Sequence, residues 1–281
     1  MYYLYCIARF MALLCPRRLS YFIASIISRF KYWISWYDRQ CVIYNLTPVL
    51  KDKKKAKRYA LRVFENFAFY LADFFSFEKI DSRFIKKYVR LSGLDNLNKA
   101  IEEKKGIVAL TAHIGNYELG GAITSYLGYD IYAIALPHRD KRINNFFNHQ
   151  RDVFKVKIIP TGIAVKKCFK ILKEKKMIAF LGDKDFVANS GEKVMICGRD
   201  ALLPRGPAFF ALKTDSVVIP SFFVREDKYY YRLIFEPPIL PYKENGVPKE
   251  TKELIEEYAS VLERYIVNYP DQWYMFSRYW L

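Results

Sequence analysis

The sequence predicts a three-layer α/β/α fold with a mixed, mostly parallel sheet and an N-terminal membrane-associated helical region. Three observations predict it. From about residue 106 onward, short apolar runs alternate with helical stretches, which is the pattern of βα units. The segment 51–77 begins basic and becomes amphipathic at helical spacing, which indicates a helix over one face of the core. The first 27 residues contain two largely apolar runs, 1–15 and 19–27.

The individual elements follow from these patterns, since apolar runs of four to nine residues bounded by turn residues favour buried strands. The expected strands are 106–111, 130–136, 156–160, 177–183, 216–224 and 229–236. The expected helices between and after them are 117–127, 141–154, 163–175, 207–213 and the amphipathic 249–267. The segment around Gly198 indicates a bent strand or hairpin before Pro204.

Length and composition predict one large folded domain with an appendage. The chain has 281 residues, of which 52% are hydrophobic and 17% aromatic, so there is ample apolar surface to offset chain entropy and disorder is excluded. We expect residues 1–50 to form a membrane-anchoring or interfacial helical region and residues 51–281 to form the main domain.

The charge balance favours an anionic partner. Lys and Arg outnumber Asp and Glu by 46 to 29, which gives a formal charge of +17. Nucleic acid is disfavoured because the chain has no zinc-finger spacing, no aromatic RNA-binding segment and no uninterrupted basic arm. A basic, aromatic-rich surface fits an anionic membrane surface better.

The five cysteines are scattered and form no CxxC pair or Cys/His cluster. This spacing predicts reduced thiols and no structural metal.

The N-terminus predicts a short anchor or interfacial helix rather than an ordinary span. The apolar run 1–15 is interrupted only by Arg9, and Pro16 separates it from a second run at 19–27. Neither run reaches the roughly 20 apolar residues of a membrane-spanning helix, and no signal-peptidase pattern follows. Four cations would keep the following chain on the cytoplasmic side, namely Arg17, Arg18, Arg29 and Lys31.

The stretch TAHIGNYELGG contains the most informative pair of residues, His113 and Glu118, with four residues between them. On a regular helix that offset turns about 500°, so the two side chains would not share a face. They meet only if a turn intervenes, and Gly115 and Asn116 supply one. We expect His113 at the carboxyl end of a strand, Asn116 as the cap of the next helix and Glu118 in its first turn.

This arrangement suits transfer of an acyl group to a hydroxyl. A neutral imidazole takes the proton of the hydroxyl, and a carboxylate on its other nitrogen fixes the tautomer. We expect amides at the helix start to hold the developing oxyanion, and no serine or cysteine nucleophile lies in the motif. The alternative is that His113 is an ordinary core histidine and Glu118 a first-turn acid favoured by the helix dipole.

The sequence resembles the late lipid A acyltransferases, the lauroyl and myristoyl transferases of Gram-negative inner membranes, within the lysophospholipid acyltransferase superfamily. The matching blocks run in order along almost the whole chain. They are IYNLTP with Asn45 and Leu46, HIGNYE, LGDKDF at 181–186, the block from Gly198 through LLPRGPAFFALKTDSVVIP, and PDQWYMFSRYW at 270–280.

The resemblance implies a set of functional residues. His113 and Glu118 would be the catalytic pair, and Asn116 and Tyr117 would shape the acceptor pocket. Asp183 and Asp185 would lie on a second loop, and Arg151 would be the family's arginine between the second and third strands. Tyr117 stands where the family usually has tryptophan, Lys184 where it has glutamine and Met275 where it has an aromatic residue, which leaves the acceptor's identity open.

The resemblance also implies the substrates and the location. The donor would be an acyl thioester carried by acyl carrier protein, an acidic partner, with no separate cofactor. The acceptor would be a lipid A precursor, and the site would lie on the cytoplasmic face of the inner membrane. We expect an apolar channel for the acyl chain, since each buried CH₂ contributes about 0.8 kcal/mol and can select for length.

Two secondary features have a functional and a structural interpretation. Arg205 and Gly206 open a helix that would meet a phosphate of the donor or acceptor, or they are a Pro-started helix with a solvated arginine. Asp183 and Asp185 lack a third ligand at metal spacing, so loop shaping or a bond to a sugar hydroxyl is favoured.

Two rival functions stay open. One is an acyltransferase acting on a glycerophospholipid or another glycolipid, although the Phe-Pro-Glu-Gly-type block usual in the glycerolipid branch is absent. The other is a non-catalytic, basic membrane-binding protein, against which the presence of both His113 and Glu118 argues.

Overall fold

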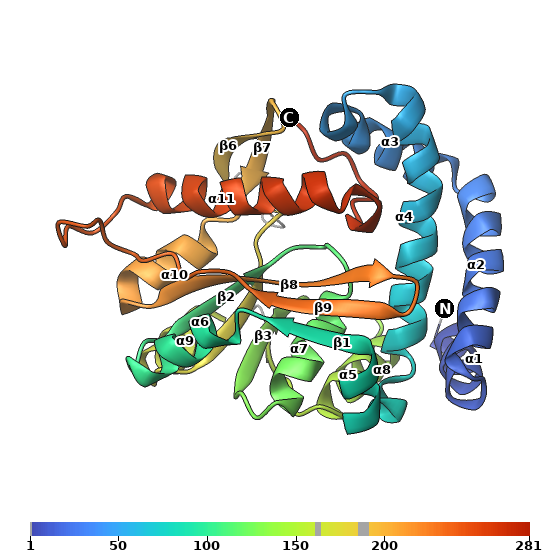
Figure 1. Cartoon of the computed structure of the whole chain (residues 1–281), viewed down its shortest axis with the longest axis horizontal. Coiled ribbons are helices and arrows are strands. Elements are labelled where there is room, and N and C mark those ends of the chain that lie inside the picture. The colour runs from blue at the N-terminus through green and yellow to red at the C-terminus, as the bar shows by residue number, and fades with distance from the viewer. Residues whose placement is uncertain (1, 161–163, 185–190) are drawn as a thin grey trace.

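The computed structural model describes residues 2–160, 164–184 and 191–281. Its centre is a seven-stranded sheet (Figure 1). The strand order is β1 (Val89–Ser92), β9 (Tyr230–Phe235), β8 (Val217–Asp227), β2 (Ile107–Thr111), β5 (Met177–Leu181), β3 (Ile131–Ala135) and β4 (Lys157–Pro160). Only the β8–β9 pair is antiparallel among these neighbours, so the predicted mixed, mostly parallel sheet is confirmed.

The central strand β2 is buried on both faces. Ile107 and Ala109 pack into the core on one side of the sheet, and Val108 and Leu110 pack into the core on the other. Successive side chains of a strand point to opposite faces, so a strand covered on both sides needs an unbroken apolar run. This explains why the sequence here shows no polar alternation.

Helices cover both faces of the sheet, which gives the three layers (Figure 1). One helical layer consists of α9 (Ala164–Lys173), α10 (Gly206–Thr214) and α11 (Thr251–Asn268), which share a core with one face of the sheet. The opposite layer contains α5 (Ser82–Tyr88), α6 (Leu94–Glu102), α7 (Tyr117–Tyr126) and α8 (Lys141–Asp152).

The expected hairpin around Gly198 is also present. It consists of β6 (Glu192–Ile196) and β7 (Arg199–Leu203), paired antiparallel. Cys197 and Gly198 both have positive φ, 51° and 69°. Two such residues between the strands are typical of a tight hairpin turn whose twist matches that of the strands.

Residues 78–105, between the helix expected at 51–77 and the first expected strand, contain more secondary structure than the sequence pattern predicts. They contain β1, α5 and α6, for which the sequence shows no clear pattern. β1 is a four-residue edge strand with intermediate or exposed side chains, so it has no apolar run. Its place beside β9 comes from tertiary pairing that a local pattern does not encode.

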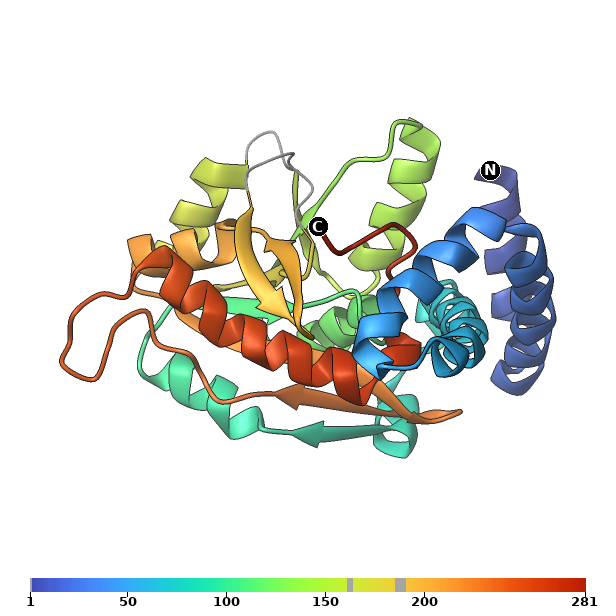
Figure 2. The same ribbon diagram turned by 90° about the horizontal axis from the view of Figure 1, so that it is seen from above.

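The N-terminal region is a set of helices: α1 (Tyr2–Leu14), α2 (Arg17–Ile34), α3 (Trp36–Leu50) and α4 (Lys53–Phe74). Figures 1 and 2 show α1 and α2 on the side of α4 that faces away from the sheet. None of the helices in the described ranges has the length and apolar content to cross a membrane. The domain boundary at residue 50 stays a prediction.

A buried charge cluster fastens α2 to the rest of the molecule. Asp73 on α4 accepts from Tyr21 at 2.7 Å and pairs with Arg17 at 3.2 Å, while Arg225 on β8 donates to the Tyr21 hydroxyl at 2.9 Å. Arg17 is therefore largely enclosed in protein, and its expected part in keeping the following chain on the cytoplasmic side stays a prediction. The bonds to Asp73 and Tyr21 compensate the cost of burying its charge.

Candidate active site

His113 follows β2, and its imidazole is held by the carboxylate of Asp183. The distance from Nδ1 of His113 to Oδ1 of Asp183 is 2.8 Å, and the backbone N–H of His113 donates to Oδ2 at 3.0 Å. Asp183 follows β5, which is the parallel neighbour of β2. The carboxyl ends of parallel neighbours share one edge of the sheet, so the topology brings the two residues together.

Asp183 is fully buried and remains a carboxylate. Burial by itself raises the pKa of this group, but the attraction of His113 and the hydrogen bonds from His113 and Trp273 outweigh it, so the pKa of Asp183 is lowered from its ordinary value of 3.8. The indole N–H of Trp273 donates to Oδ2 at 3.3 Å. A buried anion on Nδ1 fixes the imidazole tautomer that presents Nε2 as the proton acceptor.

Glu118 pairs with a different residue from the one we expected. Both of its oxygens bind the guanidinium of Arg151, with Nε–Oε2 at 3.1 Å and Nη2–Oε1 at 2.5 Å. The expected contact between Glu118 and the imidazole is thus replaced by the contact with Asp183. The reason is directional: Glu118 lies in the first turn of α7 and reaches Arg151 on α8, whereas Asp183 reaches the imidazole from the adjacent strand.

Two hydrogen-bonded tyrosines, one of them next to the imidazole, lie near the charge of Glu118. The rings of His113 and Tyr117 lie 5.5 Å apart at an angle of 75°, and the hydroxyl of Tyr70 on α4 donates to that of Tyr117 at 3.3 Å. Burial and the nearby charge of Glu118 raise the pKa of Tyr117, so its phenol is neutral. Tyr70 has no sequence motif and could not be singled out in advance.

The turn after His113 is as expected, and its glycine is required. Gly115 has φ +64°, and a Cβ there would come within 2.1 Å of the carbonyl oxygen of Phe223. Asn116 caps α7 by accepting from the backbone N–H of Leu119 at 3.1 Å, which confirms the predicted cap. The amide nitrogen of its side chain is buried and has no hydrogen-bond partner in the described parts of the chain.

Several of the amides expected to hold an oxyanion have protein acceptors instead. The N–H of Gly115 donates to Gln272 at 3.0 Å, that of Asn116 to Phe223 at 2.8 Å and that of Leu119 to the Asn116 side chain. These three donors fix the loop against the sheet and the C-terminal turn. In this structure these three N–H groups therefore already have hydrogen-bond acceptors and do not point to an oxyanion.

A small apolar cavity lies beside Tyr117, between α7 and the sheet. Its lining includes Thr111, Gly121, Thr124 and Phe223, and its volume is about 50 Å³. This volume has room for about one or two water-sized groups. The expected apolar channel is thus represented only by this small cavity, and a complete acyl chain needs the surrounding side chains to move apart.

The remaining expected residues lie elsewhere or outside the described residues. Arg205 precedes α10, which begins at Gly206, and its guanidinium pairs with Glu192 at 2.9 Å. Asp185 falls outside the described ranges. Trp273, in the PDQWYMFSRYW block, is buried in the core, and its indole N–H also donates to Asp183.

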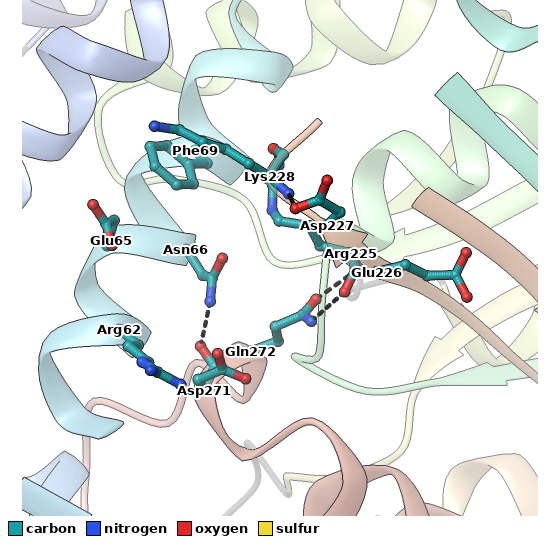
Figure 3. A pocket seen from close by; sticks show the side chains of 10 residues that line it. All are labelled: Arg62, Glu65, Asn66, Phe69, Arg225, Glu226, Asp227, Lys228, Asp271 and Gln272. Atoms are coloured by element: carbon teal, nitrogen blue, oxygen red, sulfur yellow. Dashed lines mark hydrogen bonds between the residues drawn. The ribbon is translucent and has the colours of Figure 1, made fainter. Parts of the chain in front are cut away.

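A larger cavity, of about 420 Å³, lies near the C-terminal turn (Figure 3). Gln272 crosses it and exchanges hydrogen bonds with the backbone of Arg225, at 2.8 Å to the N–H and 2.7 Å from its own amide to the carbonyl. The side chain of Asn66 donates to the carbonyl of Asp271 at 3.0 Å. The lining mixes three cations with four carboxylates, so it presents no single charge.

An α/β fold with an imidazole held by a buried carboxylate at the sheet edge defines a class of enzyme suited to activating a hydroxyl group. The sequence comparison identifies the family. The chain belongs to the bacterial lipid A biosynthesis acyltransferases, whose sequence profile matches residues 1–281. It is accordingly an acyltransferase that acts on lipids.

Relatives of known function are distant. The phosphatidylinositol mannoside acyltransferase of Mycobacterium tuberculosis strain H37Rv is 21% identical over 223 residues, covering 77% of this chain and 68% of the relative. The enzyme of the same name from Mycolicibacterium smegmatis is 22% identical over 222 residues, covering 77% and 70%.

Proposed function

We propose that this protein transfers a fatty acyl chain from the thioester of acyl carrier protein to a hydroxyl of a lipid A precursor. The observation that carries the mechanism is the 2.8 Å contact between His113 and the buried Asp183. Family membership supports the reaction class, and the formal charge of +17 supports an acidic protein donor.

In the proposed reaction His113 is the general base. Its Nε2 takes the proton of the acceptor hydroxyl as that oxygen attacks the thioester carbonyl, and Asp183 stabilises the imidazolium that forms. The tetrahedral intermediate then collapses, the C–S bond breaks, and the imidazolium returns the proton to the leaving thiolate. No acyl-enzyme intermediate is required.

The pair of Glu118 and Arg151 takes a positioning role in this proposal. It lies beside Tyr117 and joins α7 to α8, so it holds the helix that follows the His113 loop. Asn116 and Tyr117 form the part of the acceptor site nearest the imidazole. The segment of Arg205 and Gly206 remains our candidate for a phosphate of a substrate, reached when Arg205 leaves Glu192.

The acyl chain enters between α7 and the sheet in this proposal. On α7 the cavity beside Tyr117 is bounded by Gly120, Gly121 and Thr124, small residues that leave space that larger side chains would fill. An additional methyl group at Gly121 meets no atom within 4 Å. The chain would widen this cavity, and the apolar burial would offset the cost of moving the lining.

A glycolipid other than a lipid A precursor is the second candidate acceptor. The relatives described above are acyltransferases of phosphatidylinositol mannoside, which is a mannosylated phospholipid. Tyr117 in place of the usual tryptophan is the residue of this chain that most directly bears on acceptor choice.

The proposed location is the cytoplasmic face of the inner membrane. The exposed face of α2 carries Phe22, Ile26, Phe30 and Trp33, each more than half exposed and spaced at helical intervals. A surface helix with such an apolar stripe lies in a membrane interface.

Incubation of the purified protein with acyl carrier protein thioesters, coenzyme A thioesters and a panel of lipid acceptors tests the proposal. We expect a product heavier by one acyl group from the lipid A precursor, and loss of this product in His113→Ala. Equal product from His113→Ala would contradict the mechanism, and product only from a mannolipid would transfer the assignment to the second candidate.

A further inference from the structure

A cationic, aromatic cavity lies between α3, the β6–β7 hairpin and the C-terminal tail. Its volume is about 390 Å³, which is within the range of small-molecule sites. Figure 1 shows α3, the hairpin and the C-terminus along the upper edge of the molecule. Neither His113 nor Asp183 lines this cavity.

The charge of the cavity is unbalanced. Lys53, Arg199 and Arg278 line it, and no carboxylate does. Within the described ranges none of the three forms an ion pair, although the guanidinium of Arg278 lies 5.1 Å from the ring centre of Tyr44. The cavity of Figure 3 differs because its cations are matched by carboxylates. Three unpaired cations around one hollow favour an anion with several acceptor oxygens.

The walls of the cavity are fixed in place by Asn45, a buried residue of α3. Its side chain donates to the carbonyls of Met275 and Ser277 at 2.9 and 2.7 Å and accepts from the N–H of Tyr279 at 3.0 Å. The indole of Trp280 donates to the carbonyl of Asn45 at 3.1 Å. These bonds hold the tail that carries Arg278 and Trp280 against α3, so the site is already formed before a ligand arrives.

The cavity also adjoins exposed apolar surface. Trp36 and Tyr37 belong to its lining and are 63% and 62% exposed, and Trp33 and Ile34 precede them at the end of α2. Aromatic residues at such a position are typical of the membrane interface. A ligand with both an anionic head and an apolar body matches this pairing better than a soluble anion does.

We propose that this cavity binds the phosphate head group of an anionic lipid, at a site separate from the His113 centre. Arg199 and Arg278 hold the phosphate oxygens, and Trp36 and Tyr37 contact the start of the acyl chains. Trp280 separates the two sites: its ring packs 5.9 Å from that of Trp273, which in turn donates to Asp183.

The test measures, by calorimetry, the equilibrium binding of dihexanoyl phosphatidate to the full-length protein. This short lipid is soluble as a monomer. We expect the double variant Arg199→Gln/Arg278→Gln to bind about tenfold more weakly, since two charge-assisted contacts of exposed groups are lost. The matched control is Lys166→Gln/Lys167→Gln, which removes the same charge from exposed positions on α9 and should bind as the wild type does.

Two further probes distinguish the source of the phosphate. Inorganic phosphate should bind much more weakly than dihexanoyl phosphatidate. Coenzyme A should not compete with dihexanoyl phosphatidate for the cavity. Equal weakening in the two double variants, or inorganic phosphate binding as tightly as the lipid, would overturn the proposal. Tighter binding of coenzyme A that depends on Arg199 and Arg278 would assign the cavity to a donor instead.

Discussion

At the scale of single residues, two carboxylates near the carboxyl edge of the sheet bind different groups. The imidazole bond goes to Asp183 and the guanidinium bonds go to Glu118. Asp183, expected to shape a loop or bind a sugar hydroxyl, takes the place beside His113 that we expected for Glu118. This separation leads to different expectations for the two positions. Loss of Asp183 should impair chemistry, whereas loss of Glu118 should chiefly impair stability.

Glu118→Gln should lower the free energy of unfolding by about 2 kcal/mol, because it leaves the charge of Arg151 largely buried without its partner. Urea denaturation measures this. The double variant Glu118→Gln/Arg151→Gln should be more stable than the single one. Glu174→Gln is the matched control, since its partner Lys176 is more exposed and such pairs contribute less than about 1 kcal/mol. An equal effect at Glu174 would contradict the assignment.

At the scale of elements, the His113 loop depends on one backbone conformation. Gly115→Ala adds a Cβ at φ +64°, within 2.1 Å of the Phe223 carbonyl, so the loop must shift or the strand must move. We expect a loss of stability above about 1 kcal/mol, together with reduced acyl transfer.

Gly121→Ala provides the comparison for stability. This glycine lies inside α7, where an added Cβ meets no atom within 4 Å, and alanine favours a helix more than glycine does by about 1 kcal/mol. Thermal melting should therefore show Gly121→Ala at or above the wild type and Gly115→Ala below it. A higher melting temperature for Gly115→Ala than for Gly121→Ala would contradict the conclusion that the His113 loop requires the positive φ of Gly115.

The elements that the sequence predicted are those with a strong local pattern. The buried strands of the sheet, the cap Asn116 and the β6–β7 turn all follow from apolar runs and turn residues in the chain. The strand β1 and the helices α5 and α6 lack such runs, and their positions depend on pairing with distant segments. The His113–Asp183 contact spans 70 residues, so it needed the order of β2 and β5, which local patterns do not provide.

At the scale of the whole molecule, the described helices include none that could cross a membrane, while α2 carries an exposed apolar stripe. The buried cluster of Arg17, Asp73 and Arg225 fixes α2 to the α/β domain. Membrane attachment through α2 would therefore hold the whole domain, and with it the His113 site, at a constant orientation to the lipid surface.

Phe30→Gln/Trp33→Gln should weaken binding to anionic phospholipid vesicles at least about tenfold. Full burial of a large apolar side chain in the membrane contributes about 1.5–3 kcal/mol, and each substitution removes this contribution. Vesicle sedimentation measures the change. Val165→Gln/Met195→Gln removes two apolar residues that are also more than half exposed, on α9 and β6, and should leave binding unchanged. Equal losses in both variants would remove α2 as the contact surface.

The central claim is that Asp183 orients His113 for acyl transfer, and single-turnover transfer rates of three variants test it most directly. The account predicts that Asp183→Asn and His113→Ala each lower the rate about 10²- to 10⁴-fold, whereas Glu118→Gln lowers it far less once matched for folded fraction. A wild-type rate in Asp183→Asn, with Glu118→Gln as slow as His113→Ala, would contradict it.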